Sequence, residues 1–496
     1  MSLITGKFFA FLCILFILYY LIPKKFQWIL LLIGSIYFYS CSSPLLLLFL
    51  LASSVSTYLL GLISGSANLS HAKKKFSMIC CIIFNAGILI ILKYTGFVFE
   101  IIRSVTKVNL SSPSFLLPLG ISFYTFMVIS YIADVYKGEV EAERNYFKFL
   151  LYVSWFPQII EGPINRYKLI KDEMFSAHSL DIQRCKEGGY RILQGLFKKV
   201  VIAGRFSVYV DRVYASPASY DGLTLLLATV FYVIQLYTDF SGCMDMVIGI
   251  SELFGIKMSE NFNLPLFSKD VSEFWRRWHI TLGTWFKDYI YYPVFRSKFS
   301  NRLKETFKNT PLKKKATTIS ASFALFCVWS LTGIWHGAAM HYLVWGLYYA
   351  VILIIVQFLA NDFKKLNKNH PEIFKTKWFD IFRIIRTLFI VTFGELIFRA
   401  ESLKDAGIII SGIVTKFSLS GSAIAASILP FTEDNTAVGY SIVAILSFIC
   451  LYITEIFAYN GKDTFKKHKY INAAILIVVT LLFGVFGESG FLYMAY

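Results

Sequence analysis

Apolar and polar residues occur along the chain in long alternating blocks. Apolar runs long enough to form membrane helices recur from one end to the other, and the short segments between them carry most of the charge. A helix needs about 20 apolar residues to cross a bilayer. The pattern therefore predicts an all-α polytopic membrane protein. Because no long polar linker divides the chain, we expect one membrane domain over residues 1–496.

The apolar runs and the loops between them predict a topology. The expected crossings are 8–22, 26–40, 44–63, 76–92, 115–135, 319–335, 338–360, 379–398, 440–457 and 471–486. Lys and Arg collect in cytoplasmic loops, so the lysine-rich segments between alternate runs should lie inside. This alternation places the N-terminus and the C-terminus outside the cytoplasm. We interpret 8–22 as a retained span rather than a cleaved signal, because further spans follow closely.

One apolar stretch, 319–360, is too long for a single crossing. As one helix it would be about 63 Å long, twice the thickness of the hydrocarbon core. The expected break is marked by Thr332, Gly333 and Gly337. His336 lies at this break, and ionisable groups within membrane segments are rare and costly. His336 is therefore a candidate catalytic residue; the alternative is a histidine that only caps the broken helix.

The middle third of the chain is less regular. Residues 190–214 predict an amphipathic helix in the membrane interface, because Lys198, Lys199 and Arg205 alternate there with apolar residues. Residues 222–255 form another apolar run, and the sequence DFSG within it predicts a helix break.

Two carboxylates lie within that run, Asp239 and Asp245. A carboxylate within a membrane costs about 2.5–3.5 kcal/mol, so both should face a protein interior or a wet cavity. With His336 they could also line an ion path. A transporter or channel is therefore an alternative of another functional class.

Charged and aromatic residues alternate in KDVSEFWRRWHITLGTWFKDYIYYPV, residues 269–294. Asp270 followed by Glu273 predicts a capping box, and Glu273 is placed to pair with Arg277 one turn later. The alternation is typical of a helix that lies at the headgroup level. This segment holds His279, for which a functional role and a role as a packing or interfacial histidine are both open.

Composition adds two exclusions. The net charge of +18, from 49 Lys and Arg against 31 Asp and Glu, is explained by basic cytoplasmic loops, so we expect membrane lipids as surroundings and no nucleic-acid partner. The eight cysteines show no paired metal-type spacing and most lie inside apolar runs. We expect them to pack as small apolar residues, with neither disulfides nor a metal site.

Four stretches together resemble the membrane-bound O-acyltransferase family, and within it the bacterial alginate O-acetyltransferase branch. They are PLGISFYTFMVISYIADVY (118–136), FPQIIEGPINRY (156–167), IQLYTDFSGCMDMVIGI (234–250) and FWRRWHITLGTWFKDYIYYPV (274–294), and TGIWHGA and FRAES (398–402) agree with them. The resemblance covers nearly the whole chain. It implies a ring of transmembrane helices, with interfacial or re-entrant helices, around a thin central funnel in the bacterial cytoplasmic membrane.

The resemblance also implies a site and a reaction. The two signature histidines of the family fall on His336 and His279, and an acyl group passes from a cytoplasmic thioester to a hydroxyl outside. We expect His336 to act as the base that this reaction needs, and His279 to bind or polarise the donor. Arg276 and Arg277 are candidates for the donor phosphates, with lipid headgroups as the alternative. The predicted substrate-binding set is completed by Trp278, Trp335 and Asp239.

The C-terminal tail, residues 488–496, ends in FLYMAY. It is similar to a C-terminal motif of related envelope acylation systems, in which a tyrosine carries the acyl group. Phe491, Leu492 and Tyr493 match that motif, whereas Met494 and Tyr496 depart from it. We predict that Tyr493 forms a covalent acyl intermediate outside the cytoplasm; the alternative is an interfacial aromatic anchor.

These features together predict O-acetylation of an extracellular polysaccharide or of peptidoglycan. We expect acetyl-CoA or another acyl thioester as donor substrate, no bound cofactor, and an extracytoplasmic SGNH-type acetyltransferase as partner. The nearest alternative is D-alanylation of teichoic acid, which would need an acyl carrier protein as donor.

Overall fold

The computed structural model describes residues 2–41, 44–107, 115–431, 437–462 and 468–486. Within these ranges the chain is helical and forms no strand. Six of the described helices are long and apolar enough to cross a membrane: Leu47–Gly65, His71–Arg103, Gly222–Leu253, Lys313–His336, Met340–Asn369 and Gly439–Tyr459. The prediction of an all-α polytopic membrane protein is therefore confirmed.

The chain forms two compact units. The first holds residues 1–196 and 243–260, and the second holds residues 197–242 and 261–485. Helix α11 (Gly222–Leu253) contributes residues to both. The single domain over residues 1–496 stays a prediction, as does the placement of both termini outside the cytoplasm.

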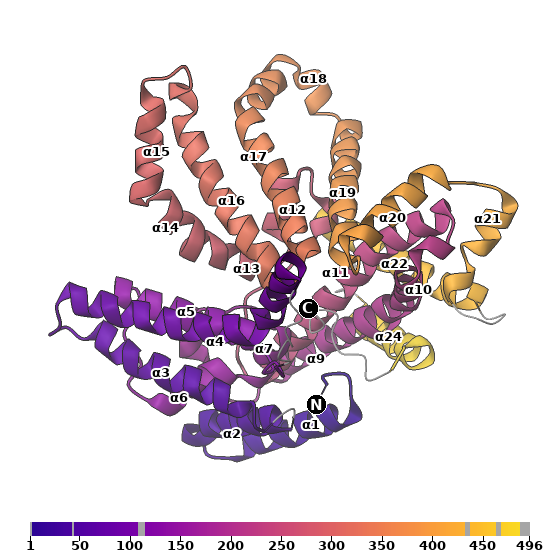
Figure 1. The fold of residues 1–496 in the computed structure, drawn as a ribbon. Helices are drawn as coiled ribbons and strands as arrows, with labels where there is room; N and C mark the ends of the chain where they lie inside the picture. Colours follow the sequence, from indigo (N-terminus) through magenta and orange to yellow (C-terminus); the bar gives the residue numbers. More distant parts are fainter. Residues whose placement is uncertain (1, 42–43, 108–114, 432–436, 463–467, 487–496) are drawn as a thin grey trace. The chain divides into compact units, whose positions relative to one another are not determined.

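The first unit is built from α1 to α9. Their bounds are α1 Gly6–Leu21, α2 Gln27–Ser40, α3 Leu47–Gly65, α4 His71–Thr106, α5 Ile121–Lys137, α6 Tyr146–Ser154, α7 Phe156–Glu161, α8 Tyr167–Phe175 and α9 Ile182–Phe197. Helices α3, α4 and α5 pack against one another (Figure 1). Because α1 and α2 have only 16 and 14 residues, a full crossing by either stays a prediction.

The fourth predicted span was too short. Instead of a crossing over 76–92 followed by a link to the next span, α4 is one helix of 36 residues. It begins after Ser70, whose hydroxyl accepts a hydrogen bond from the backbone N–H of Lys73. Residues 93–106 contain no proline, so scattered charges alone do not end the helix. It ends at Lys107, which has the left-handed conformation typical of a helix C-terminus.

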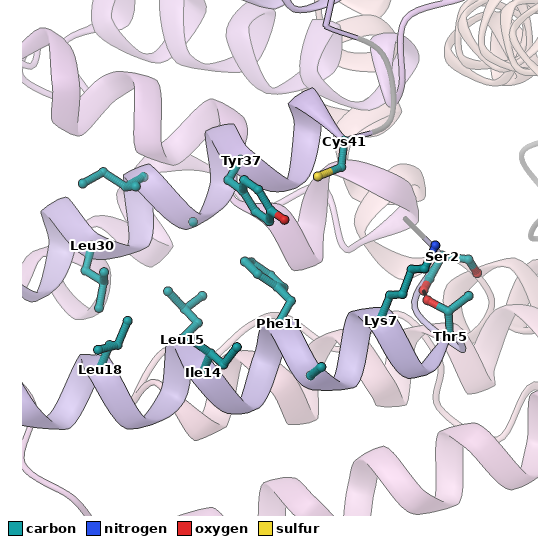
Figure 2. A pocket seen from close by; sticks show the side chains of 13 residues that line it. Ser2, Thr5, Lys7, Phe11, Ile14, Leu15, Leu18, Leu30, Tyr37 and Cys41 are labelled. Carbon is teal, nitrogen blue, oxygen red and sulfur yellow. Dashed lines mark hydrogen bonds between the residues drawn. The ribbon is translucent and has the colours of Figure 1, made fainter.

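A groove of about 1060 Å³ lies between α1 and α2 (Figure 2). Phe11 and Tyr37 face each other across it, with ring centroids 5.7 Å apart. Most of its lining is apolar, and Ser2, Thr5 and Lys7 form a polar group at the start of α1. None of the predicted site residues that the structure describes lines this groove.

The second unit contains the other helices. In chain order they are α10 Gly204–Ala215, α11, α12 Val271–Arg277, α13 Ile280–Phe286, α14 Tyr292–Phe295, α15 Lys298–Lys308, α16 Ala316–His336, α17 Met340–Asn369, α18 Pro371–Phe374, α19 Lys377–Arg399, α20 Leu403–Thr415, α21 Gly421–Ala426, α22 Ala437–Tyr459 and α24 Lys469–Phe483. Helices α16 and α17 run side by side, and α17 also packs on α19 (Figure 1).

The predicted break in residues 319–360 is confirmed, but only one of its three markers lies there. Helix α16 continues through Thr332 and Gly333 and ends at His336, and α17 begins at Met340. Gly333 serves close packing instead: a Cβ at this position would lie 2.5 Å from the carbonyl oxygen of Tyr342. At Gly337 a Cβ would lie 2.0 Å from the Tyr342 ring, so a side chain there would displace this ring from the end of α16.

The predicted amphipathic helix over 190–214 is interrupted. Between α9 and α10 the chain forms a π-helical segment, Lys198–Ala203. The wider turn leaves backbone groups outside the regular helical pattern, and the carbonyl of Val200 accepts a hydrogen bond from the N–H of Val485. Lys199 lies in this segment and is only 6% exposed, so its side chain faces protein rather than a polar outer face, while the interfacial position of the segment stays a prediction.

Two further local predictions were wrong. The sequence DFSG does not break its helix, because α11 runs without interruption from Gly222 to Leu253. The segment 269–294 is not one helix. It divides at Trp278 and His279, where His279 has a left-handed backbone with φ of 46°. The helix start is as predicted: Asp270 accepts a hydrogen bond from the Glu273 N–H, and Glu273 pairs with Arg277.

The close approach of α16 and α17 yields a first prediction. Gly346→Ala should lower the stability of the detergent-solubilised chain by about 1–3 kcal/mol, because the new Cβ would lie 2.4 Å from the carbonyl oxygen of Trp329. The matched control is Gly407→Ala in α20, where a Cβ meets no atom within 4 Å. Thermal unfolding followed by circular dichroism compares the two variants. Equal melting temperatures would show that this contact does not hold the helices together.

Candidate active site

His336 is the last residue of α16 and is 4% exposed. Three aromatic rings surround its imidazole: Trp335 at 4.7 Å, Trp345 at 5.0 Å and Phe398 at 5.1 Å between ring centroids. The rings of Trp345 and Phe398 stand nearly perpendicular to the imidazole. Such edge-to-face contacts fix the plane of a ring more tightly than aliphatic packing does. The histidine is therefore held in a defined orientation within an apolar, water-poor site.

The second predicted histidine occupies a different kind of position. His279 is 3% exposed and forms the junction between α12 and α13. Its Nδ1 lies 3.4 Å from Oδ1 of Asn261. The same amide oxygen accepts hydrogen bonds from the backbone N–H and the hydroxyl of Thr281, at 3.0 and 2.7 Å. If Nδ1 carries the proton, as a hydrogen bond to this oxygen requires, Nε2 has the lone pair that can accept one.

The protonation state of His279 follows from its burial. This residue lies outside the candidate membrane spans, and burial lowers its pKa to about 3. His279 is therefore neutral near pH 7 and supplies a hydrogen-bond donor or acceptor rather than a positive charge. Any help that it gives to a donor substrate must come from such a hydrogen bond.

Trp335 connects the two histidines. Its ring contacts the neighbouring His336 and also lies 6.4 Å from the His279 ring, at an angle of 58°. On its other side, the His279 ring stands edge-to-face to Phe240 of α11 at 4.8 Å. The second unit therefore brings His336, Trp335 and His279 into one aromatic cluster, although the sequence separates the histidines by more than fifty residues.

Three further predicted site residues, Arg276, Arg277 and Trp278, lie at the end of α12, and their surroundings differ. Arg276 is exposed, so its guanidinium is open to solutes. Arg277 instead holds the local fold, with its side chain hydrogen-bonded to Glu273 at 3.0 Å and to the carbonyl of Asn263 at 2.9 Å. Trp278 is 5% exposed and its ring stacks on Phe274 at 5.5 Å. A substrate contact is therefore open to Arg276 and much less so to Arg277 and Trp278.

Asp239 forms a buried ion pair. Its carboxylate lies 2.5 Å from Nζ of Lys199, and the two side chains are 11% and 6% exposed. Asp245, in the first unit, pairs in the same way with Arg191 at 3.1 Å. Both carboxylates of the apolar run thus face protein, as predicted, and each has a cationic partner. This weakens the transporter alternative, because an ion path needs groups that exchange partners with the ion.

Tyr493, and with it the tail 488–496, lies outside the described residues. Three residues of the described site were missed by the sequence reasoning: Asn261, Trp345 and Glu395. Glu395 had a signal, because it is the only charged residue in the apolar stretch 387–398. Asn261 had none, since an asparagine in a polar loop predicts nothing by itself. In the part of the chain that the structure describes, no group of three His, Cys, Asp or Glu side chains could hold a metal ion.

Comparison with known proteins gives a family. The family model described as MBOAT, membrane-bound O-acyltransferase family, matches residues 36–309. This range includes His279 and ends before His336. It covers more than half of the chain and reaches into both units.

Three curated relatives show what similar chains do. The chain is 35% identical over 404 residues to "Probable alginate O-acetylase AlgI" of Pseudomonas aeruginosa, which covers 80% of this chain and 72% of the relative. It is 28% identical to the peptidoglycan O-acetyltransferase of Helicobacter pylori, over 97% of this chain and 94% of that protein. It is 32% identical to the teichoic acid D-alanyltransferase of Bacillus subtilis, over 57% of this chain and 69% of that protein.

The burial of His279 generates a prediction on pH. The unfolded histidine binds a proton below about pH 6.5, whereas the folded one stays neutral down to a pKa of about 3. The unfolded state therefore binds more protons between these values, and the stability that the neutral ring contributes is lost as the pH falls. His279→Gln should reduce this loss between about pH 7 and pH 5 by at most about 1.4 kcal/mol per pH unit.

Apparent melting temperatures of the detergent-solubilised chain and of this variant, measured across that pH range, check the prediction. If the two curves fall in parallel, His279 does not titrate as its burial requires.

Proposed function

Because the chain belongs to the membrane-bound O-acyltransferase family, we propose that it moves an acetyl group from a cytoplasmic thioester to a hydroxyl of an extracellular polysaccharide or of peptidoglycan. That the chain is a multi-pass membrane protein and an O-acyltransferase follows from the family and its helices. The side of the membrane on which each substrate binds, the acetyl donor and the polymer are parts of the proposal.

The observation that carries the proposal is the placement of His336. The residue ends a helix long enough to cross a membrane and is buried among three aromatic rings. Acyl transfer to a hydroxyl needs a base for the O–H proton. A neutral imidazole has a ring nitrogen with a lone pair that can accept this proton. His336 has the chemistry and the surroundings that this step requires.

The transfer runs in two steps in our proposal. First, His336 takes the proton from the hydroxyl of Tyr493 while the phenolic oxygen attacks the thioester carbonyl carbon. The C–S bond then breaks, the thiolate takes the proton from the imidazolium and leaves as a thiol, and an acetyl ester remains on Tyr493. Second, an SGNH-type acetyltransferase outside the cytoplasm receives the acetyl group on its serine, which frees Tyr493, and passes it to a polymer hydroxyl.

The donor side of the proposal rests on the other histidine. His279 is neutral, and with its Nδ1–H directed at Asn261 its Nε2 would bind the donor by accepting a hydrogen bond from an N–H or O–H group of that substrate. Arg276 is exposed on the preceding helix and is open to phosphate groups such as those of acetyl-CoA. We assign Asp239 an indirect role, in which its ion pair with Lys199 stabilises α11 behind Phe240 and His279.

We base the proposed polymer on the activities that the names of the relatives state. The names of two relatives specify O-acetylation, of alginate in one case and of peptidoglycan in the other, and the second spans nearly the whole of both chains. The similarity to the teichoic acid D-alanyltransferase favours a second candidate, transfer of D-alanine from an acyl carrier protein. The match there covers only 57% of this chain, so we place acetylation first. We also propose the bacterial cytoplasmic membrane as the location, with both termini outside.

The base role of His336 yields a prediction. His336→Ala should abolish O-acetylation of the envelope polymer, because the attacking hydroxyl keeps its proton. The matched control is His370→Ala at the exposed end of α17, which should acetylate normally. For both variants, O-acetylation is measured as the acetate that mild alkali releases from purified polymer. The amount of the chain in the membrane is checked by immunoblot. Acetylation that survives in His336→Ala would remove this residue from catalysis.

The relay yields another prediction. Tyr493→Phe keeps the aromatic ring but lacks the hydroxyl, so polymer acetylation should stop while the chain still inserts into the membrane. Tyr496→Phe, three residues further on, is the control and should acetylate normally. The same acetate assay checks both. Normal acetylation by Tyr493→Phe would contradict the relay. His336 would then act as the base for an acceptor hydroxyl other than that of Tyr493.

A further inference from the structure

A single carboxyl group is buried beside the candidate active site. Glu395 of α19 is 5% exposed. Its Oε1 accepts two hydrogen bonds at 3.3 Å, one from the indole N–H of Trp345 and one from the hydroxyl of Tyr349. Both donors belong to α17 and are themselves almost fully buried. Burying a carboxyl group is costly unless it forms hydrogen bonds, so this position calls for an explanation.

A glycine in α19 allows the close approach of α17 and α19. A Cβ at Gly394, the neighbour of Glu395, would lie 2.4 Å from the hydroxyl oxygen of Tyr349. The glycine therefore lets α19 come near enough to α17 for the carboxyl group to reach both donors. One turn later on α19, Phe398 packs against His336 and against Trp345, at 5.1 Å in each case.

The carboxyl group reaches His336 through one side chain. The ring of Trp345 stands edge-to-face to the imidazole, at 5.0 Å and 83°. The indole N–H of the same ring is the group that donates to Glu395. Rotation of this indole would therefore break the hydrogen bond and would also change the contact that orients His336.

We propose that Glu395 is a positioning residue for His336: it anchors the indole of Trp345, and the indole fixes the plane of the imidazole. The inference rests on the proposed role of His336 as the base. A base must point its lone pair at the attacking hydroxyl, and small errors in that geometry cost much of the rate. The described partners of Glu395 are a neutral N–H and a neutral O–H, so the role needs a hydrogen-bond acceptor rather than a negative charge.

This role predicts how different replacements behave. Glu395→Gln keeps an acceptor oxygen at the same position and should retain most of the activity. Glu395→Leu has a similar volume without the acceptor, and its kcat should fall by between about tenfold and a hundredfold with little change in KM for the donor. Trp345→Phe removes the indole N–H and should cause a similar fall. The double variant Glu395→Leu with Trp345→Phe should be no worse than either single variant, because both lose the same interaction.

The matched control is Tyr349→Phe. It removes the other donor to the same carboxyl group but keeps the ring, so its kcat should stay within about twofold of the wild type. Initial rates are measured in inverted membrane vesicles that contain the full chain, with radiolabelled acetyl-CoA as probe, as label transferred to envelope polymer or to the chain. Rates are divided by the amount of chain that elutes as a single species after solubilisation.

Each outcome decides one point. If the wild-type vesicles transfer no label, the proposed acetylation fails and this inference fails with it. If the wild type is active and Glu395→Leu equals it, only the positioning role is overturned. The role is also overturned if Glu395→Gln falls as far as Glu395→Leu, or if Tyr349→Phe falls as far as Trp345→Phe. The positioning role is supported if kcat falls in Glu395→Leu and in Trp345→Phe but stays near the wild-type value in Glu395→Gln and in Tyr349→Phe.

Discussion

The close contact between α16 and α17 is the constraint on which the candidate active site depends. Gly333 and Gly346 let the two backbones approach, since a Cβ at either position would lie about 2.5 Å or less from a carbonyl oxygen of the other helix. This contact places Trp345 beside His336, although the chain turns between them. Without it the histidine would lose the Trp345 ring, one of the three rings that orient it.

The second constraint is the cost of polar groups in an apolar surrounding. Three buried polar side chains near the site have a partner on another element: Asp239 pairs with Lys199, Glu395 with Trp345 and Tyr349, and His279 with Asn261. These partners come from distant parts of the sequence, so each pairing also fixes one element against another. The groups that hold the fold together are in this way the groups that position the two histidines.

The sequence predicted the class of fold and the break at His336, because both depend on long runs of apolar residues and on one glycine. It also predicted the capped start of α12, a local feature of Asp270 and Glu273. What it missed depends on contacts between distant residues. The ion pair of Lys199 could not be predicted, because its partner Asp239 is forty residues away in the sequence. Helix α11 continues through DFSG, and most of its length is buried against other parts of the protein. The role of Glu395 could be inferred only from the structure, which shows Trp345 and Tyr349 of α17 as its hydrogen-bond donors.

The central claim is that His336 acts as the base while Tyr493 of the chain itself takes the acetyl group from a thioester. Mass spectrometry of the C-terminal peptide, after brief incubation of membranes with acetyl-CoA, tests this most directly. The account predicts an acetyl group on Tyr493 in the wild type and none in His336→Ala. An unmodified tyrosine in membranes that actively acetylate polymer, or an acetylated tyrosine in His336→Ala, would contradict it.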